Sequence, residues 1–239
     1  MDEMEKTLNK AFPNAITIKG LFDKIDSAIE ELGFKHSHVK AAKAICRDDS
    51  VDEIGKELFN RGYPNAFSMQ TLSGLPVSGV TGMVAYYHHI PDDGLGLIIY
   101  SPHIGIDSNG RLGYLDRHGI KELGKSCGAN HAIIGHWKKG NAGPYENDPE
   151  LSGVSSRLKE FKDRILKEKD PLLALTELEY KVGLETLSNF ISQVQKSEHH
   201  KYPILVFAGI NIDIRSDEIN RFQLRDKKLF KDGIATNYS

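Results

Sequence analysis

The sequence lacks any uninterrupted apolar stretch long enough to cross a membrane, and it lacks a long run of basic residues. A membrane-spanning helix needs about 20 predominantly apolar residues, so none is expected. Lysine and arginine total 31 against 33 acidic residues, which gives a formal net charge of −2. This balance provides no general attraction to nucleic acid or to an anionic membrane surface, and we expect neither as a partner.

A secretory signal is also missing from the start of the sequence. Residues 1–10 mix acidic residues with lysines, without the basic segment and apolar run of an export signal. We therefore expect a soluble protein of the cytoplasm or of an organelle stroma.

Cysteine is scarce, with only Cys46 and Cys127 in 239 residues. A chain of this length can build a hydrophobic core without a covalent cross-link. Without an export signal, two cysteines are more typical of metal ligands, reactive thiols or buried apolar side chains than of a disulfide. The cysteine count alone leaves these three roles open.

The order of predicted elements indicates an α/β fold. Residues 1–65 read as mainly helical, with helices over residues 21–32, 37–46 and 51–60. Short apolar runs at 95–101 and 202–211 are typical of buried strands, and residues 129–137 and 158–195 are mostly helical. This order predicts a mainly parallel central sheet flanked by helices. Because no repeat or linker is evident, residues 1–239 are predicted to form a single domain.

Three candidate metal ligands lie near the ends of predicted elements. Cys46 ends a predicted helix, His103 follows the strand at 95–101, and Cys127 precedes a helix. Zinc suits two thiolates and one imidazole, with a fourth position left for water. Each residue also has a simpler interpretation, because lone cysteines are often core thiols and lone histidines often structural. His88 and His89 compete with His103, so the residues alone leave the ligand set open.

Several short segments together carry a resemblance to a known family. They are residues 44–49 (AICRDD), 75–82 (LPVSGVTG), 88–92 (HHIPD), 100–107 (YSPHIGID), 117–119 (RHG) and 126–129 (SCGA), with Gly110 and Gly113 between them. In this order they resemble the limiting-CO2-inducible proteins B and C, which are similar to β-carbonic anhydrases. The resemblance implies a β-carbonic-anhydrase-like fold and a homodimer. It also implies Zn²⁺ held by Cys46, His103 and Cys127, and interconversion of CO2 and bicarbonate through a zinc-bound hydroxide.

The same resemblance suggests further site residues. β-Carbonic anhydrases carry a Cys-x-Asp-x-Arg motif, and here Asp48 holds the aspartate place while Ser50 holds the arginine place. Asp48 is then expected either to orient the zinc-bound group or to occupy the fourth coordination place in a resting form, and the simpler alternative is that it caps the next helix. Arg47 is the neighbouring arginine, but adjacency in sequence does not place its guanidinium beside Asp48. His88 and His89 are candidate proton shuttles because imidazole titrates near neutral pH, and a structural role in the turn is equally plausible for both.

Other functions remain open on the sequence. The missing arginine is compatible with a catalytically silent, zinc-containing protein that binds bicarbonate or CO2 or serves as a scaffold. Another zinc hydrolase or deaminase is a second alternative, although the His-Glu-x-x-His and paired Cys-x-x-Cys patterns are absent. A third is a hydrolase that uses Cys127 as nucleophile at a helix N-terminus, where the helix dipole favours the thiolate.

Overall fold

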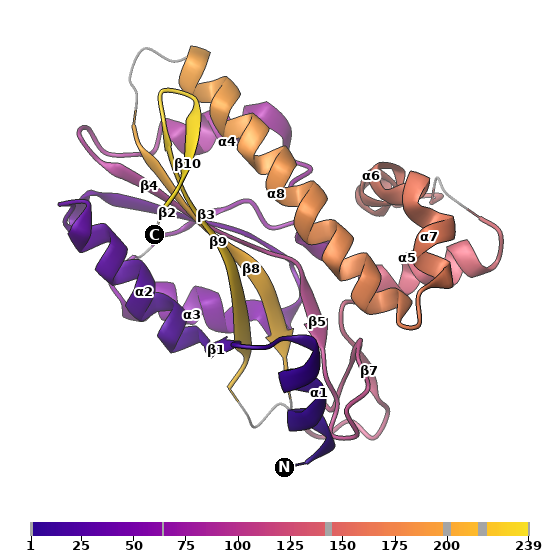
Figure 1. Ribbon diagram of the computed structural model, residues 1–239. Coiled ribbons are helices and arrows are strands. Elements are labelled where there is room, and N and C mark those ends of the chain that lie inside the picture. The colour runs from indigo at the N-terminus through magenta and orange to yellow at the C-terminus, as the bar shows by residue number, and fades with distance from the viewer. Residues whose placement is uncertain (1, 64, 142–144, 198–201, 215–218, 239) are drawn as a thin grey trace.

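A mixed sheet forms the centre of the computed structural model, which describes residues 2–63, 65–141, 145–197, 202–214 and 219–238. Its order is β1-β9-β8-β4-β2-β3, with β10 paired to β9 and β5 paired to β8 (Figure 1). The strands are β1 (Ile16–Thr17), β2 (Val39–Ile45), β3 (Phe67–Ser68), β4 (Leu95–Ser101), β5 (His103–Gly105), β8 (Ile204–Asp213), β9 (Arg221–Lys231) and β10 (Ile234–Asn237). A separate hairpin joins β6 (Tyr114–Leu115) to β7 (Gly124–Lys125).

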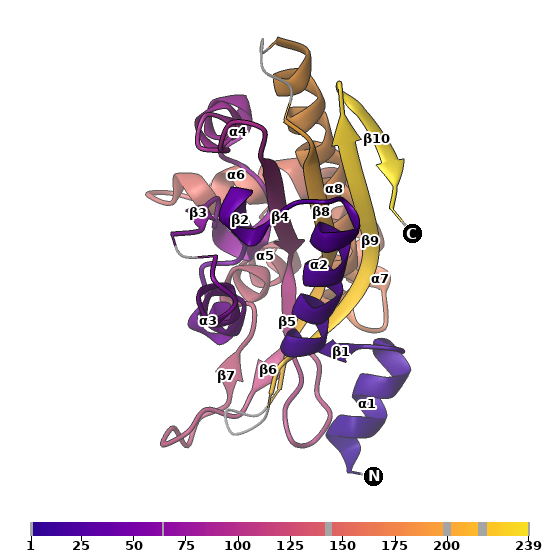
Figure 2. The same cartoon turned by 90° about the vertical axis from the view of Figure 1, so that its left-hand side faces the viewer.

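The parallel strands β2, β4 and β8 lie side by side in the middle of this sheet, and Figure 2 shows them with β9 beyond β8. β4 is buried along its whole length, as expected for an apolar strand covered on both faces. The predicted α/β fold with a mainly parallel core sheet is confirmed. β1, β9 and β10 pair antiparallel and were not predicted. β9 contains mostly charged and polar residues, so it shows no apolar run that would indicate a strand.

The segment predicted as a helix at residues 37–46 is instead strand β2. Val39, Ala42 and Ile45 are three residues apart, a spacing that also fits one face of a helix. In the structure this segment pairs with β4 from Val39↔Leu95 to Ile45↔Ser101. That continuous hydrogen bonding, together with the burial of most of the strand, outweighs the high helix propensity of its alanines. The correction places Cys46 at the carboxyl end of a strand.

Helices cover both faces of the sheet. α2 (Ile18–Glu31) and α3 (Asp52–Asn60) pack on one face, whereas α1 (Glu3–Ala11), α4 (Gly79–Tyr87) and α8 (Pro171–Ser197) cover the other (Figure 1). α2 and α3 confirm the helices predicted at 21–32 and 51–60. None of the described helices is both long and apolar enough to pass through a membrane.

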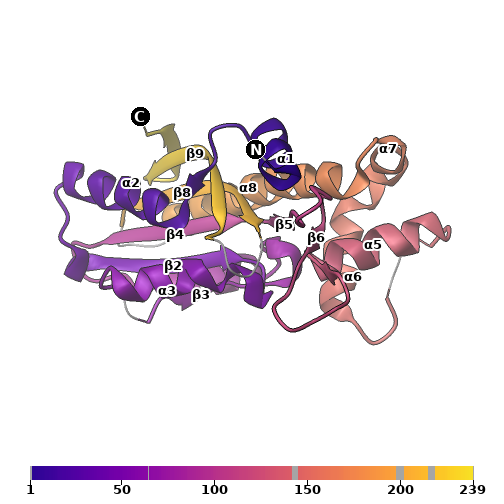
Figure 3. The same cartoon turned by 90° about the horizontal axis from the view of Figure 1, so that it is seen from below.

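A third group of helices extends the structure beyond one end of the sheet. α5 (Gly128–Lys138), α6 (Pro149–Leu158) and α7 (Lys162–Lys167) pack with the first half of α8 around Trp137 and Leu175. Figure 3 shows α5, α6 and α7 together at this end, next to the hairpin of β6 and β7. α5 confirms the predicted helix at 129–137, and Cys127 is the residue immediately before its first turn.

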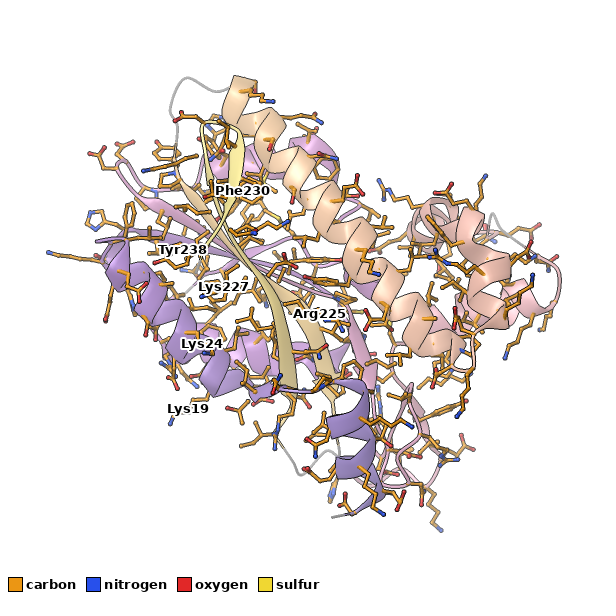
Figure 4. The ribbon with its side chains drawn as sticks, in the orientation of Figure 1. Lys19, Lys24, Arg225, Lys227, Phe230 and Tyr238 are labelled. Atoms are coloured by element: carbon orange, nitrogen blue, oxygen red, sulfur yellow. The ribbon has the colours of Figure 1, made fainter. Side chains whose placement is uncertain are left out.

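The C-terminal residues pack against helix α2. Tyr238 donates a hydrogen bond of 2.8 Å to Glu31 of α2, and the Lys227 ammonium lies 5.6 Å from the centre of the Tyr238 ring. Figure 4 shows Lys227 and Tyr238 on the same face as Lys24. A groove of about 390 Å³ lies between α2 and these C-terminal residues. The C-terminal strands therefore belong to the same layered structure as the N-terminal helices.

Candidate metal centre

Cys46, His103 and Cys127 converge at the carboxyl ends of the parallel strands. Cys46 follows β2, His103 opens β5, and Cys127 is the residue before α5. The parallel register sets Ile45 beside Ser101, so the residues that follow these strands meet at one edge. One donor atom from each of the three side chains lies within 4.8 Å of the others, and all three residues are buried.

The distances within this cluster fit a tetrahedral metal. The two sulfur atoms are 3.8 Å apart, too far for a disulfide bond of about 2.05 Å. Two sulfurs that each lie about 2.3 Å from a tetrahedral Zn²⁺ would be separated by roughly 3.8 Å. His103 Nε2 is buried and has no hydrogen-bond partner among the described residues. Two thiolates and a free imidazole nitrogen form a donor set suited to zinc, with one tetrahedral position left over.

His103 is held in place by Asp213, at the end of β8. The His103 Nδ1 atom lies 2.6 Å from Asp213 Oδ2, which leaves Nε2 to face the two sulfurs. Ser50 and Ser126 donate hydrogen bonds of 2.7 and 2.5 Å to the same carboxylate oxygen, and Asn211 donates to Oδ1 at 2.7 Å. Carboxylates commonly orient metal-binding histidines in this way. Asp213 is therefore a positioning residue of the site.

The three candidate ligands perturb one another's ionisation. A hydrogen bond with Cys127 lowers the pKa of Cys46 to about 4 against the opposing effect of burial. The same hydrogen bond, together with burial, raises the pKa of Cys127. Burial lowers the pKa of His103, but Asp213, Cys127 and Cys46 outweigh it and hold that pKa well above its usual value. The hydrogen bond between the two sulfurs thus favours a single thiolate in the cysteine pair, and Asp213 with the two sulfurs favours the protonated form of the imidazole.

Asp48 lies beside the cluster and has two partners. Its Oδ1 atom accepts a hydrogen bond of 3.1 Å from the main-chain N–H of Ser50, in the manner of a capping residue. Arg117 Nη2, from the loop between β6 and β7, lies 3.5 Å from the same oxygen. The main chain of Asp48 also forms a hydrogen bond that lowers the pKa of Cys46. Asp48 therefore both caps its turn and pairs with an arginine near the candidate ligands.

Arg47 is not brought to Asp48. Its Nε atom donates to the main-chain oxygen of Gln70 at 3.2 Å, and its Nη1 atom lies 3.1 Å from Glu150. The Arg47 side chain is largely exposed. Within this chain, the guanidinium that approaches Asp48 belongs to Arg117.

His88 is not brought to the cluster either. It is exposed and follows the last turn of α4. In that turn, Tyr86 donates hydrogen bonds to the main-chain oxygens of Lys40 and Leu97, in the first halves of β2 and β4. His103 lies beyond the opposite end of β4. Within a single chain, His88 is thus separated from the candidate ligands by the length of that strand.

Two residues of the site were missed by the sequence interpretation. Asp213 is the last residue of the apolar strand β8, and Asn211 lies two residues before it. Two polar residues on the same face at the end of an apolar strand could have indicated a site residue. Arg117 lies in the RHG segment that contributed to the family resemblance, but no property of that segment connects it to Asp48. Only the folded loop reveals that contact.

The comparison with protein families is decisive for the classification. Residues 15–227 match the family described as limiting CO2-inducible proteins B/C β-carbonic anhydrases. The chain belongs to this family. The predicted resemblance to limiting-CO2-inducible proteins B and C is thereby confirmed, and the family description supports a carbonic-anhydrase-like class. No curated protein matches the chain.

Solved structures with this family's fold resemble the chain over nearly its whole length. PtLCIB4, a homolog of the limiting CO2-inducible protein LCIB, is 23% identical, with a TM-score of 0.89 over 97% of this chain and 98% of the other. Its S47R mutant is 23% identical, with a TM-score of 0.83 and 98% coverage of both chains. LCIB itself is 22% identical, with a TM-score of 0.72 and 97% coverage of both. These likenesses establish the fold.

Proposed function

We propose that the chain is a zinc-dependent carbonic anhydrase that interconverts CO2 and bicarbonate. The observation that carries this proposal is the buried cluster of Cys46, His103 and Cys127, whose 3.8 Å sulfur separation and unpartnered imidazole nitrogen suit a tetrahedral zinc. Membership of a family described as β-carbonic anhydrases supports the same function. When bound, zinc supplies a Lewis acid that lowers the pKa of a water molecule to about 7.

The surrounding residues prepare the site for this chemistry. Asp213 fixes the His103 ring, and burial excludes bulk water from the sulfurs of Cys46 and Cys127. Asp48, held by the Ser50 N–H and by Arg117, provides a carboxylate that accepts a hydrogen bond from the reacting water and orients it. Arg117, rather than Arg47, supplies the arginine of this pair in our proposal.

Proton transfer to solvent and the oligomeric state complete the proposal. His88 is exposed, so its imidazole is accessible to solvent. Because it lies far from the candidate ligands of its own chain, it could act as a shuttle only at the metal centre of a second copy of the chain. Family membership supports a homodimer, which is tested by the mass of the zinc-loaded protein in sedimentation or light scattering. The His88 role stays a prediction until His88→Ala is assayed in weak and strong buffers, because buffer rescues a lost shuttle.

Metal analysis combined with a CO2-hydration assay tests the function. We expect about one zinc per chain in purified protein and hydration above the buffer rate in stopped-flow measurements at two pH values. Cys127→Ser and His103→Ala are expected to lose zinc and activity together. Absence of zinc, or zinc content unaffected by both substitutions, would contradict the proposed metal centre.

A catalytically silent zinc protein of the same family is the second candidate. Ser50 occupies the arginine place of the β-carbonic anhydrase motif, and its hydroxyl is engaged with Asp213 at 2.7 Å. Stoichiometric zinc and measurable bicarbonate binding, without hydration above buffer at either pH, would favour this candidate over the enzyme.

A further inference from the structure

The hairpin of β6 and β7 brings Arg117 to Asp48, beside the candidate metal centre. Leu115, the last residue of β6, pairs with Gly124, the first residue of β7. Arg117 comes two residues after Leu115, in the loop that joins the two strands. Gly124 therefore faces, from the opposite strand, the segment that leads to Arg117.

The side chain of Arg117 lies directly over the main chain of Gly124. A Cβ atom added at Gly124 would lie 2.9 Å from the Nε atom of Arg117 and 3.1 Å from its Cδ atom. Non-bonded carbon atoms in favourable contact are about 3.5–4.0 Å apart, so both distances are too short. The Arg117 side chain therefore occupies the space that any side chain at position 124 would need.

The backbone conformation of Gly124 does not itself require glycine. Its φ lies outside the left-handed region, so an alanine there would adopt the same conformation without strain. The nearest main-chain atom to the added carbon is the Leu115 oxygen at 3.0 Å, a contact that a small shift of the hairpin relieves. The contact with Arg117 is shorter, and a long side chain moves more readily than a paired strand. An added methyl group would therefore act mainly by displacing Arg117.

The main chain on both sides of Arg117 is held by hydrogen bonds. The Ile120 N–H donates to the main-chain oxygen of Arg117 at 3.1 Å, which closes a turn after it. On the preceding side, the Asp116 carboxylate accepts a hydrogen bond of 2.7 Å from the Ser108 N–H. These contacts fix where the Arg117 side chain begins, so a change at Gly124 alters where that side chain ends.

The contact between Arg117 and Asp48 is sensitive to such a displacement. Arg117 Nη2 lies 3.5 Å from Asp48 Oδ1, close to the limit of about 4 Å for an ion pair. Nη2 belongs to the same planar guanidinium group as Nε, the atom that would meet the added methyl group. A movement of this group by about 1 Å away from Asp48 would take the pair beyond that limit.

We propose that Gly124 is a positioning residue of the metal centre, because the absence of a side chain there provides the space through which Arg117 reaches Asp48. This inference rests on the proposed function, in which the Asp48 carboxylate orients the reacting water. Gly124 acts through Arg117, and Arg117 acts through Asp48. A residue with a side chain at position 124 would separate the aspartate–arginine pair while leaving the candidate metal ligands in place.

A double-mutant cycle of Gly124→Ala and Arg117→Ala separates positioning from a structural role. Gly124→Ala should lower kcat/KM for CO2 hydration about tenfold, with zinc content at the wild-type level. In the Arg117→Ala background the same substitution should have almost no further effect, because the side chain that the methyl group displaces is already gone. A purely structural role in the hairpin predicts equal losses in both backgrounds.

A matched control and a readout that does not depend on activity complete the test. Gly135 lies in α5, and a Cβ added there would have no contact within 4 Å with other parts of the described chain, so Gly135→Ala should keep wild-type rates. Crystal structures of wild type and Gly124→Ala report the contact directly. In the variant, Arg117 Nη2 should lie more than about 4 Å from Asp48, with the main chain of the hairpin unchanged.

The results distinguish this inference from the proposed function. If the two substitutions act additively on hydration, or if Arg117 keeps its contact with Asp48 in Gly124→Ala, the inference is wrong. Failure of Gly124→Ala to fold or to bind zinc also overturns it, because the hairpin itself would then require the glycine. If wild type shows no hydration but Arg117 moves away from Asp48 in Gly124→Ala, the positioning role stands and the enzymatic function fails.

Discussion

Arg117 Nη2 lies 3.5 Å from Asp48 Oδ1, so a loop far along the chain places a guanidinium beside the carboxylate that follows Cys46. Ser50, at the place where β-carbonic anhydrases carry their arginine, instead donates a hydrogen bond to Asp213. The aspartate–arginine pair of this chain is therefore assembled from two separate segments.

This relationship predicts unequal effects for two arginines. Arg117→Ala should lower kcat/KM for CO2 hydration about 10–100-fold, because Asp48 loses the charge that orients it, while zinc content stays at the wild-type level. Arg47→Ala removes an arginine that pairs with Glu150 instead, and we expect it to keep near wild-type rates. Stopped-flow hydration and metal analysis of both variants provide the comparison. A large loss in Arg47→Ala with none in Arg117→Ala would reverse the assignment.

Asp213 should control metal affinity through His103. Asp213→Asn removes the charge that holds the imidazole Nδ1 atom at 2.6 Å, and we expect zinc affinity to fall about 10–100-fold in competition with a chelator. Asp226→Asn is the matched control, because Asp226 lies on β9 and contacts Tyr180. Equal zinc affinity in wild type and Asp213→Asn would show that the carboxylate does not position the ligand.

Zinc binding should release protons at neutral pH. The lowered pKa of Cys46, about 4, means that this thiol is already ionised, whereas the raised pKa values of Cys127 and His103 mean that both still carry the proton that the metal replaces. We therefore expect release of about two protons per zinc and an affinity that rises with pH. Calorimetry in buffers with different ionisation enthalpies measures this number. In Asp213→Asn the His103 pKa falls, so proton release should decrease toward about one.

Glu179 of α8 is fully buried, and it should make stability depend on pH. Burial raises its pKa from an ordinary value of 4.5 to about 8 in the folded protein, so between these pH values the folded state binds a proton that the unfolded state has lost. The contribution of this residue to the free energy of unfolding therefore decreases as pH rises through this range. Denaturant unfolding of metal-free wild type and metal-free Glu179→Gln at about pH 5 and about pH 8 isolates the effect. The wild-type protein should lose more stability than the variant, and parallel changes would contradict the raised pKa.

Elements with a strong local pattern of apolar residues could be predicted from the sequence alone. Three such elements are the apolar strand β4, the amphipathic helix α2 and the helix that follows Cys127. They could be predicted because the spacing of apolar residues in the sequence indicates which side chains are buried. The ordered motifs also identified the family and its candidate ligands Cys46, His103 and Cys127. The prediction of a helix at strand β2 is wrong because its seven residues, three alanines and two lysines between Val39 and Ile45, also fit the spacing of one helix face.

The contacts that orient the candidate ligands depend on how distant segments fold together. Asp213 reaches His103 because β8 pairs with β5 in parallel, and Arg117 reaches Asp48 because the loop between β6 and β7 folds back over the strand ends. Each contact joins two residues that are far apart in the sequence. It forms only when the fold brings the two side chains within a few ångströms of each other, and the local sequence does not show this separation. The candidate metal ligands could thus be proposed from the sequence motifs, whereas the residues that contact them and set their charge could be found only in the fold.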